Sequence, residues 1–164
     1  MWPEWKMVQI EKYTENWKEE AALLSVRSDQ AEFTVGNITQ VVQDLNEGEH
    51  PHLIVSDGKA VGFFLLDLDY SSKYQFGNVK AIGVRALLVD QNYQGLGIAK
   101  KAILSLPDYV RAHYPDFEAL QLTVNCRNIP AYQCYQKAGF EDTGDLYHGG
   151  PVGPQHIMQV SFTQ

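Results

Sequence analysis

Residues 89–101, VDQNYQGLGIAKK, pass from a β-favouring run into a helical pattern through two glycines. The first N–H groups of a helix have no acceptor within the helix, and the helix dipole places partial positive charge there, so a phosphate can bind to them. Gly95 and Gly97 carry no side chain that would keep an anion away from the backbone. The stretch therefore predicts a phosphate-binding turn between a strand and a helix.

Glycine pairs at such turns also serve plain packing, so the two glycines alone do not decide the matter. Two other phosphate motifs are missing from the sequence. It has no GxxxxGK[ST] run for a nucleoside triphosphate, and no GxGxxG run followed by a second strand and an acidic residue for a dinucleotide. We therefore expect a phosphate-bearing cofactor of another kind.

A second motif follows the next predicted strand, where residues 125–140 read NCRNIPAYQCYQKAGF. This run resembles the Asn-x-x-Ala-x-x-x-Tyr-x-Lys-x-Gly-Phe pattern of the GNAT superfamily of acyl-CoA N-acyltransferases. Gln94, Gly97 and Ala99 likewise resemble the [Arg/Gln]-x-x-Gly-x-[Gly/Ala] signature of that family. The resemblance covers residues 60–140 well and the preceding helices more loosely; in this family such helices shape the acceptor pocket.

The resemblance implies that acetyl-CoA is the co-substrate, with its diphosphate on the backbone of the glycine turn. In this family the strand before the turn splays away from the next strand, and the pantetheine arm lies in the gap and pairs with exposed backbone groups. The cofactor-binding residues implied in this way are Leu87, Leu88, Val89, Gln94, Gly95, Leu96, Gly97, Ile98, Ala99, Lys100, Asn125, Asn128 and Ala131.

Acetyl transfer from a thioester to an amine needs a neutral amine, stabilisation of charge on the thioester oxygen, and a proton for the leaving thiolate. Tyr135 matches the family's general-acid tyrosine, and its alternative role is packing. The backbone N–H of Val89 or its neighbour would meet the oxyanion. Asn128 resembles the family's asparagine that bonds the pantetheine or adenosine portion, and it also stands where a helix N-cap is expected.

The general base is not identified by the sequence. Many family members carry a glutamate on the strand before the glycine turn, whereas residues 81–87 read AIGVRAL. Asp67 and Asp69 stand two apart on the preceding strand, so we expect them on one face, as proton acceptors, as an ammonium site or as a solvated strand end. Arg85 lies among apolar residues and is expected to pair with an acid or to face the acceptor cleft.

Hydrophobic periodicity predicts the remaining elements. Strands are expected over residues 7–10, 52–55, 60–68, 79–89 and 119–124, with a hairpin turn at Asp57-Gly58. Helices are expected over residues 16–28, 39–46 and 129–138, and from residue 97 with a kink or division at Pro107. A turn is expected over residues 49–51, a loop over 69–78, and strand fragments around a Gly/Pro-rich loop over 149–154. This order predicts an α+β, three-layer fold of the GNAT type, with a mixed, mostly antiparallel central sheet and helices on both faces.

Bulk composition limits the function classes. The 164 residues are 45% hydrophobic and 20% charged, which fits a single globular domain over residues 1–164. The formal net charge of −7 argues against nucleic acid as a partner and mildly favours cationic substrates, although many proteins are acidic for solubility alone.

Cys126 and Cys134 fit neither a disulfide scaffold, nor a CxxC motif, nor a zinc site, so we expect a cytoplasmic protein without a metal. The first residues contain no apolar run of signal-peptide or membrane-spanning length, so no membrane partner is expected.

The leading hypothesis is an N-acetyltransferase that acts on a primary amine of a small molecule, with polyamines among the candidates, by direct attack and with Tyr135 as general acid. One alternative is an acetyl-CoA-binding sensor without turnover, which the missing strand glutamate leaves open. Another is acetylation of a protein N-terminus or lysine, which needs an open groove. Homodimers are frequent in the family, but no stretch of the sequence identifies an interface.

Overall fold

The computed structural model describes residues 7–26, 30, 37–73 and 80–162. Within these residues, the strands are β1 (Val8–Lys12), β2 (Glu49–Ser56), β3 (Lys59–Asp67), β4 (Ala81–Val89), β5 (Ala119–Asn125), β6 (Glu141–Tyr147) and β7 (Gln155–Ser161). The helices are α1 (Lys18–Ala22), α2 (Ile38–Gln43), α3 (Tyr70–Lys73), α4 (Ile98–His113) and α5 (Ile129–Lys137), with short 3-10 turns η1 (Glu15–Trp17) and η3 (Gln91–Tyr93).

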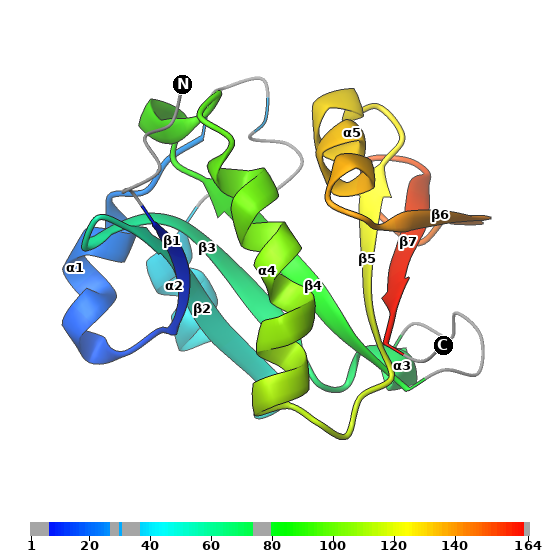
Figure 1. The fold of residues 1–164 in the computed structure, drawn as a ribbon, viewed down its shortest axis with the longest axis horizontal. Coiled ribbons are helices and arrows are strands. Elements are labelled where there is room, and N and C mark those ends of the chain that lie inside the picture. The colour runs from blue at the N-terminus through cyan, green and yellow to red at the C-terminus, as the bar shows by residue number, and fades with distance from the viewer. Residues whose placement is uncertain (1–6, 27–29, 31–36, 74–79, 163–164) are drawn as a thin grey trace.

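The strands form one sheet in the order β1-β2-β3-β4-β5-β7-β6 (Figure 1). Strands β1 to β4 form one antiparallel meander, and β5, β7 and β6 form a second antiparallel group. A parallel pairing of β4 with β5 joins the two groups. Asp57 and Gly58 adopt positive φ angles of 54° and 76° between β2 and β3, which confirms the predicted hairpin turn.

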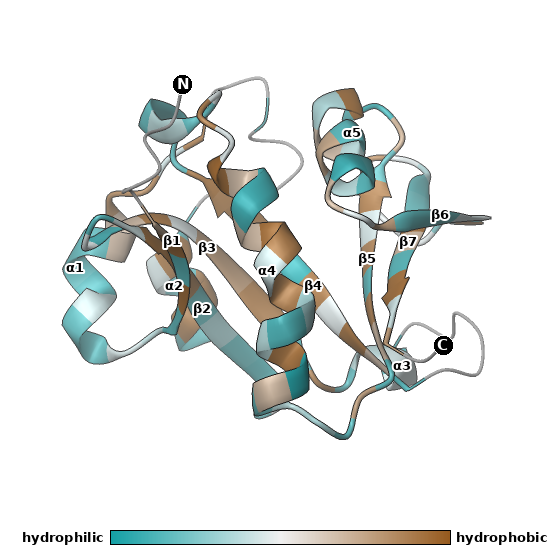
Figure 2. Cartoon of the chain, viewed as in Figure 1, coloured by the Kyte–Doolittle hydropathy of each residue, from teal (hydrophilic) through white to brown (hydrophobic). Residues whose placement is uncertain are grey.

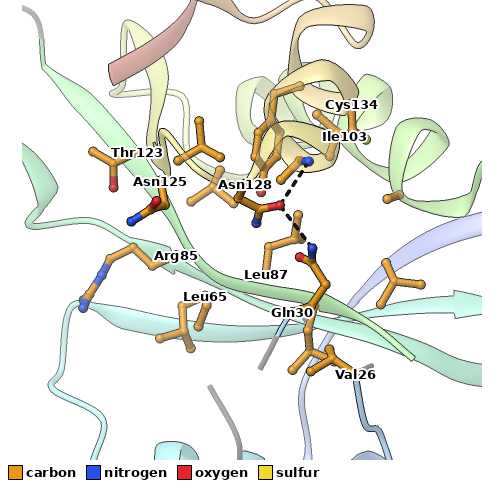
Figure 3. Close-up of a pocket in the computed structure, with 18 of the residues that line it drawn as sticks. Val26, Gln30, Leu65, Arg85, Leu87, Ile103, Thr123, Asn125, Asn128 and Cys134 are labelled. Carbon is orange, nitrogen blue, oxygen red and sulfur yellow. Dashed lines mark hydrogen bonds between the residues drawn. The ribbon is translucent and has the colours of Figure 1, made fainter. Parts of the chain in front are cut away.

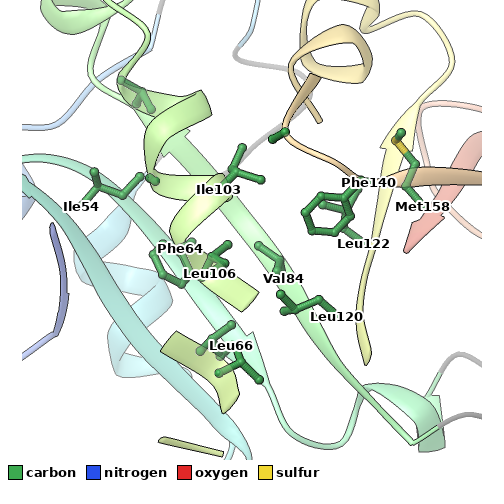
Figure 4. Packing of buried hydrophobic residues seen from close by; sticks show 14 of the residues in the cluster. Ile54, Phe64, Leu66, Val84, Ile103, Leu106, Leu120, Leu122, Phe140 and Met158 are labelled. Atoms are coloured by element: carbon green, nitrogen blue, oxygen red, sulfur yellow. The ribbon is translucent and has the colours of Figure 1, made fainter. Parts of the chain in front are cut away.

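Helix α4 covers one face of the sheet, in front of β3 and β4 in Figure 1. It is amphipathic, as the alternation of hydrophobic and hydrophilic residues along it in Figure 2 makes visible. Its residues Ile103 and Leu106 are buried in a cluster with Phe64 and Val84 of the sheet (Figure 4). The same cluster continues to Phe140, just after α5, so one core reaches across both strand groups.

The opposite face of the sheet is covered by α1 and α2. Ala21 and Ile38 from these helices are buried with Leu53, Phe63 and Leu65 of β2 and β3. Successive strand residues point to opposite faces, so each central strand contributes to both cores. This arrangement confirms the predicted α+β, three-layer fold with helices on both faces.

Two helix predictions need correction. The helix expected over residues 16–28 is only the turn η1 followed by α1, and residues 23–26 are not helical; residues 27–29 lie outside the described part. Pro107 neither divides nor ends α4, which continues from Ile98 to His113. The proline ring removes one backbone hydrogen bond, but burial of the apolar face of α4 on both sides of it outweighs that loss.

Two loop predictions also change. Residues 49–51, expected as a turn, are the first residues of β2 and pair with residues 65–67 of β3. The polar stretch expected as a loop over residues 69–78 begins with the short helix α3. Its last part, residues 74–78, lies outside the described residues.

Candidate active site

The two strand groups separate beyond a short parallel seam. Strands β4 and β5 pair only at Ala81–Ala119, Ile82–Leu120 and Gly83–Gln121, all within the described residues. Beyond these pairs the strands diverge toward α5 (Figure 1). The gap opens into a cavity of about 1130 Å³ that β4, α4, α5 and the 149–152 loop line. The splayed strand pair is therefore present.

Strand β4 carries a β-bulge where it lines this cavity. Arg85 pairs with Leu65 and Leu88 pairs with Phe63, so two residues of β4 oppose one residue of β3. Ala86, inside the bulge, has a φ of 57°, a left-handed conformation that costs free energy for any residue other than glycine. A bulge bends a strand and changes the direction of its backbone groups, here within the cavity wall.

The end of β4 turns one backbone N–H toward the cavity. Asp90 donates its N–H to the carbonyl of Val61 at 2.8 Å, on the β3 side of the strand. The carbonyl of Val89 accepts from Nε2 of Gln94 at 3.0 Å, on the other side. Because the N–H and C=O of one residue point to the same edge of a strand, the N–H of Val89 faces the gap.

The glycine turn leaves the start of α4 open. Gly95 and Gly97 have φ angles of 80° and 77°, and a Cβ built on either glycine would meet no atom within 4 Å. Packing therefore does not require these glycines, whereas their backbone conformation does. Among the described residues no side chain caps α4, and its first turn holds no acidic residue. The first N–H groups of α4, at the cavity edge, are thus able to receive an anion.

Asn128 stands at the N-terminus of α5, on the other side of the gap (Figure 3). Its Oδ1 accepts from the N–H of Ala131 at 3.4 Å, which confirms the N-cap role, and from Nε2 of Gln30 at 3.2 Å. Gln30 belongs to the segment between α1 and α2, so this contact connects the two sides of the cavity. Asn125 also lines the cavity, but its Nδ2 donates to the carbonyl of Val152 at 3.0 Å and holds the 149–152 loop.

Tyr135 and Cys134 lie on α5 and contribute to the cavity wall. The Tyr135 ring packs against Phe140, with 5.9 Å between ring centroids. Burial raises the pKa of the Tyr135 hydroxyl above its ordinary value, and the neighbouring Cys134 adds to that rise. Burial also raises the pKa of the Cys134 thiol, which disfavours a reactive thiolate. Tyr135 thus holds its proton at neutral pH.

Opposite charges meet at the far end of the cavity. Nη1 of Arg85 donates to Oε2 of Glu49 at 2.7 Å and to Oδ2 of Asp67 at 3.2 Å. Nζ of Lys73 binds the same Asp67 oxygen at 3.0 Å. Asp67 is fully buried, so these cations compensate a carboxylate that water does not reach. Asp69 is exposed in the turn after β3 and does not share the position of Asp67.

Most residues predicted for the site line this one cavity. These are Arg85, Leu87, Leu88, Val89, Gln94, Gly95, Gly97, Ile98, Ala99, Lys100, Asn125, Asn128, Ala131 and Tyr135. Three predicted residues do not. Leu96 points outward from the turn and is 40% exposed, while Asp67 and Asp69 lie outside the cavity lining. β3 ends at Asp67, which is buried, and Asp69 is exposed beyond it, which for Asp69 fits the alternative of a solvated strand end.

Other lining residues escaped the sequence reasoning: Gln30, Asp44, Glu49, Tyr147 and Gln155. Glu49 could have been found by extending the alternation of β2, since it shares a face with Leu53 and Val55. Gln30 carries no local signal, because only the tertiary structure brings it to Asn128.

The 149–152 loop closes one wall of the cavity. A Cβ at Gly149 would collide with the hydroxyl of Tyr147, and a Cβ at Gly150 would collide with Nε2 of Gln155. The two glycines therefore leave space that Tyr147 and Gln155 fill, and both side chains line the cavity. The loop is a packed part of the wall.

Among the described residues, no group of three or more His, Cys, Asp or Glu side chains could hold a metal ion. In the same part of the chain, no helix is long and apolar enough to span a bilayer.

The model of the acetyltransferase (GNAT) family matches residues 2–140. The chain belongs to the GNAT family. It is therefore an acetyl-CoA-dependent N-acetyltransferase, as the two sequence motifs predicted.

Curated relatives agree with the assignment to the GNAT family. The uncharacterized N-acetyltransferase YbbJ of Bacillus subtilis (strain 168) is 34% identical over 113 residues, which cover 68% of this chain and 70% of YbbJ. The spermine/spermidine N(1)-acetyltransferase of the same strain is 27% identical over 135 residues, which cover 79% of this chain and 86% of the relative.

Solved GNAT structures share the fold. Aminoglycoside acetyltransferase AAC(6')-Ib in complex with coenzyme A and kanamycin superposes with a TM-score of 0.78 at 21% identity, over 95% of both chains. Spermidine N-acetyltransferase from Vibrio cholerae, in complex with CoA and spermine, gives a TM-score of 0.70 at 14% identity, over 94% of this chain and 95% of the neighbour. At these identities the likeness concerns the fold.

The residues of this GNAT protein fit acetyl-CoA. A diphosphate needs N–H donors without a side chain in front of them, and Gly95 and Gly97 leave the start of α4 open in this way. Lys100 lines the cavity near these amides and adds a positive charge. The gap between β4 and β5 exposes strand edge for an extended polar arm.

Proposed function

We propose that this enzyme transfers the acetyl group of acetyl-CoA to a primary amine of a small molecule, with polyamines as the first acceptors to test. The observation that carries the proposal is the single cavity that runs from the glycine turn to the charged end at Glu49 and Arg85. The packed 149–152 loop forms one of its walls, which favours a small acceptor over a peptide. A relative named for spermine and spermidine supports the choice of first acceptors.

When bound, acetyl-CoA supplies an activated acetyl thioester. The chain's part in holding it would fall to the N–H groups of residues 98–100, with Gly95 and Gly97 giving access. Asn128 would face the same molecule from α5. In this arrangement groups on both sides of the gap would orient the thioester.

In the reaction, the N–H of Val89 would donate a hydrogen bond to the oxygen on which negative charge develops. The hydrogen bond from Gln94 to the Val89 carbonyl holds this peptide group in place. A donor that is already oriented needs no rearrangement during the reaction, which is why such groups stabilise transition states well.

Tyr135 would donate its hydroxyl proton to the sulfur that leaves. The raised pKa keeps this proton on Oη at neutral pH, and a thiolate that forms nearby is a suitable acceptor for it. The attacking nitrogen gives up a proton as the amide forms, and that proton would return to the Tyr135 hydroxyl directly or through solvent.

The acceptor amine would enter at the other end of the cavity. Asp44 is a carboxylate in the lining there, and it supports an acceptor that carries positive charge. Arg85 is bound to Glu49, so its own charge is compensated in the same wall. The long-range field of a protein with a net charge of −7 acts in the same direction.

The test is a thiol-release screen with acetyl-CoA against polyamines, aminoglycosides, amino acids and peptides. Small amines should release free CoA thiol, and Tyr135→Phe should not support the same rate. Binding of CoA without thiol release for any amine would identify a sensor instead. Release with peptides alone would identify a protein acetyltransferase.

A further inference from the structure

Arg85 precedes the bulge in β4 and is bound to both neighbouring strands of the meander. Its Nη1 lies 2.7 Å from Oε2 of Glu49 on β2 and 3.2 Å from Oδ2 of Asp67 on β3. Glu49 and Asp67 are direct partners across the β2–β3 ladder. One guanidinium thus connects three adjacent strands at the point where β4 leaves regular pairing.

Both carboxylates are fixed by other groups. Oε1 of Glu49 accepts from the N–H of Asn46 at 2.9 Å. Asp67 accepts from the N–H of Asp69 at 3.0 Å and from Lys73 at 3.0 Å. The Glu49 and Asp67 side chains are 10% and 0% exposed and the Arg85 side chain is 35% exposed, so the ion pairs are partly shielded from solvent and from screening by salt.

The segment that follows Arg85 needs such support. On the β5 side its pairing has ended at Gly83, so β3 is its one neighbouring strand among the described residues. Ala86 adopts a left-handed φ of 57°, which persists only where surrounding contacts enforce it. At the other end, Gln94 and Val61 bind Val89 and Asp90. The bulge is therefore held at both ends.

We propose that Arg85 is a positioning residue for acetyl transfer: its ion pairs with Glu49 and Asp67 fix the bulge, and the bulge in turn directs the N–H of Val89 toward the thioester. This inference rests on the proposed function for its kinetic consequence. It assigns Arg85 no contact with the coenzyme.

The central variant is Arg85→Met, which keeps the aliphatic stem and removes the charge. We expect kcat to fall about 10- to 100-fold, the scale of a small misplacement of a reacting group, while the Kd for CoA and the KM for the amine stay within about threefold. Arg85→Lys should restore part of kcat, because it restores one ion pair. Arg111→Met is the matched control and should leave kcat unchanged. Arg111 pairs with Asp108 on the exposed face of α4.

Amide hydrogen exchange gives a readout that needs no acceptor. In Arg85→Met the amides of Leu88 and Asp90, which face β3, should exchange at least about tenfold faster than in the wild type, while those of α4 should not change. If Arg85→Met does not fold, Glu49→Gln is the second variant, because it removes one of the two ion pairs. It should lower kcat and speed up amide exchange, each by a smaller factor.

Unchanged kcat and unchanged exchange in Arg85→Met would overturn the proposal. So would a rise in KM confined to acceptors that carry a carboxylate, since Arg85 would then bind the acceptor itself. If the wild type acetylates no amine, the proposed function fails, and the exchange rates alone decide whether Arg85 holds the bulge.

Discussion

Gln94 donates its side-chain amide to the carbonyl oxygen of Val89 at 3.0 Å, so the first residue of the glycine signature is bound to the last residue of β4. The hydrogen bond lies on the strand edge that faces the cavity. The edge that would meet the thioester and the turn that would meet the diphosphate are therefore one structural unit. Loss of the Gln94 side chain is therefore expected to disturb both the turn and the strand edge.

Tyr135→Phe removes the hydroxyl that we assign as the proton donor and keeps the ring against Phe140. We expect kcat to fall about 10²-fold, within the usual range for loss of a general acid, while the Kd for CoA stays the same. Thiol release gives kcat and calorimetry gives the Kd. Tyr132→Phe on the same helix is the control, because its hydroxyl binds Asp142 outside the cavity. Equal rates for wild type and Tyr135→Phe would remove Tyr135 from the mechanism.

Gly97→Ala should weaken coenzyme binding more than it weakens the fold. A Cβ at this position meets open space, so the cost to stability is the left-handed φ alone, about 1 kcal/mol. The same methyl group would stand in front of the helix amides and should reduce CoA affinity about tenfold or more. Gly58→Ala is the matched control. Gly58 lies in the β2–β3 hairpin with a φ of 76°, and a Cβ there would also meet open space. The two variants should have about the same free energy of unfolding in chemical denaturation. Calorimetry should show weaker CoA binding for Gly97→Ala than for Gly58→Ala. Equal CoA affinities would argue against a phosphate at the turn.

Asn128→Asp separates the two roles of Asn128. Aspartate is as good an N-cap as asparagine, so the free energy of unfolding should change by less than about 0.5 kcal/mol. The added negative charge faces the cavity and should reduce CoA affinity about tenfold through repulsion of the phosphates. Asn37→Asp caps α2 in the same way, away from α5, and should not alter CoA affinity. Wild-type affinity in Asn128→Asp would leave Asn128 as a helix cap alone.

His52 should make the fold sensitive to acid. It is fully buried; its Nδ1 donates to the carbonyl of His50 at 2.9 Å, and its Nε2 accepts from the hydroxyl of Tyr109 at 2.9 Å. Burial lowers the pKa of His52 to about 4, below the value of 6.5 in an unfolded chain. The unfolded state therefore binds the proton first, and stability present above pH 6.5 is lost as the pH falls toward 4, by up to about 3 kcal/mol.

The variant His52→Phe tests this pH dependence. Phenylalanine keeps the stacking on Phe64 but leaves the Tyr109 hydroxyl without its acceptor, so the variant should be less stable at pH 7 by about 1–3 kcal/mol. Its free energy of unfolding, measured in urea, should fall less steeply than the wild type's between pH 6.5 and 4. His148→Gln, at an exposed position, should keep the wild-type slope. The same slope in His52→Phe would show that His52 does not titrate in this range.

The parts of the fold that were predictable are those with a local signal. Asp57-Gly58 and the glycines of the phosphate turn need positive φ, and the sequence places glycine or aspartate at these positions. The buried face of α4 follows a helical period, so it was visible as well. Pro107 led to a wrong prediction because the effect of a proline on a helix was judged from the local sequence alone. Burial along the whole of α4 decides that the helix continues through Pro107.

The parts that were missed depend on tertiary structure. Ala86 has no sequence signal for a left-handed φ, so the bulge could not be anticipated. Arg85 was expected to pair with an acidic residue, but the sequence did not indicate which one. Its partners lie on β2 and β3, and the strand register that brings them to Arg85 cannot be derived from the sequence. The same register buries Asp67 and leaves Asp69 outside, which the spacing of two residues could not indicate.

The parallel seam between β4 and β5 has a consequence for the range of acyl donors. It consists of pairs at residues 81–83 and 119–121, and each strand group keeps its own antiparallel ladders. A small rotation of one group against the other would change the width of the gap without breaking a hydrogen bond within either group. Substitutions at seam residues other than Gly83, whose Cβ would collide with the buried Tyr70 ring, are thus a route to donors with chains longer than acetyl.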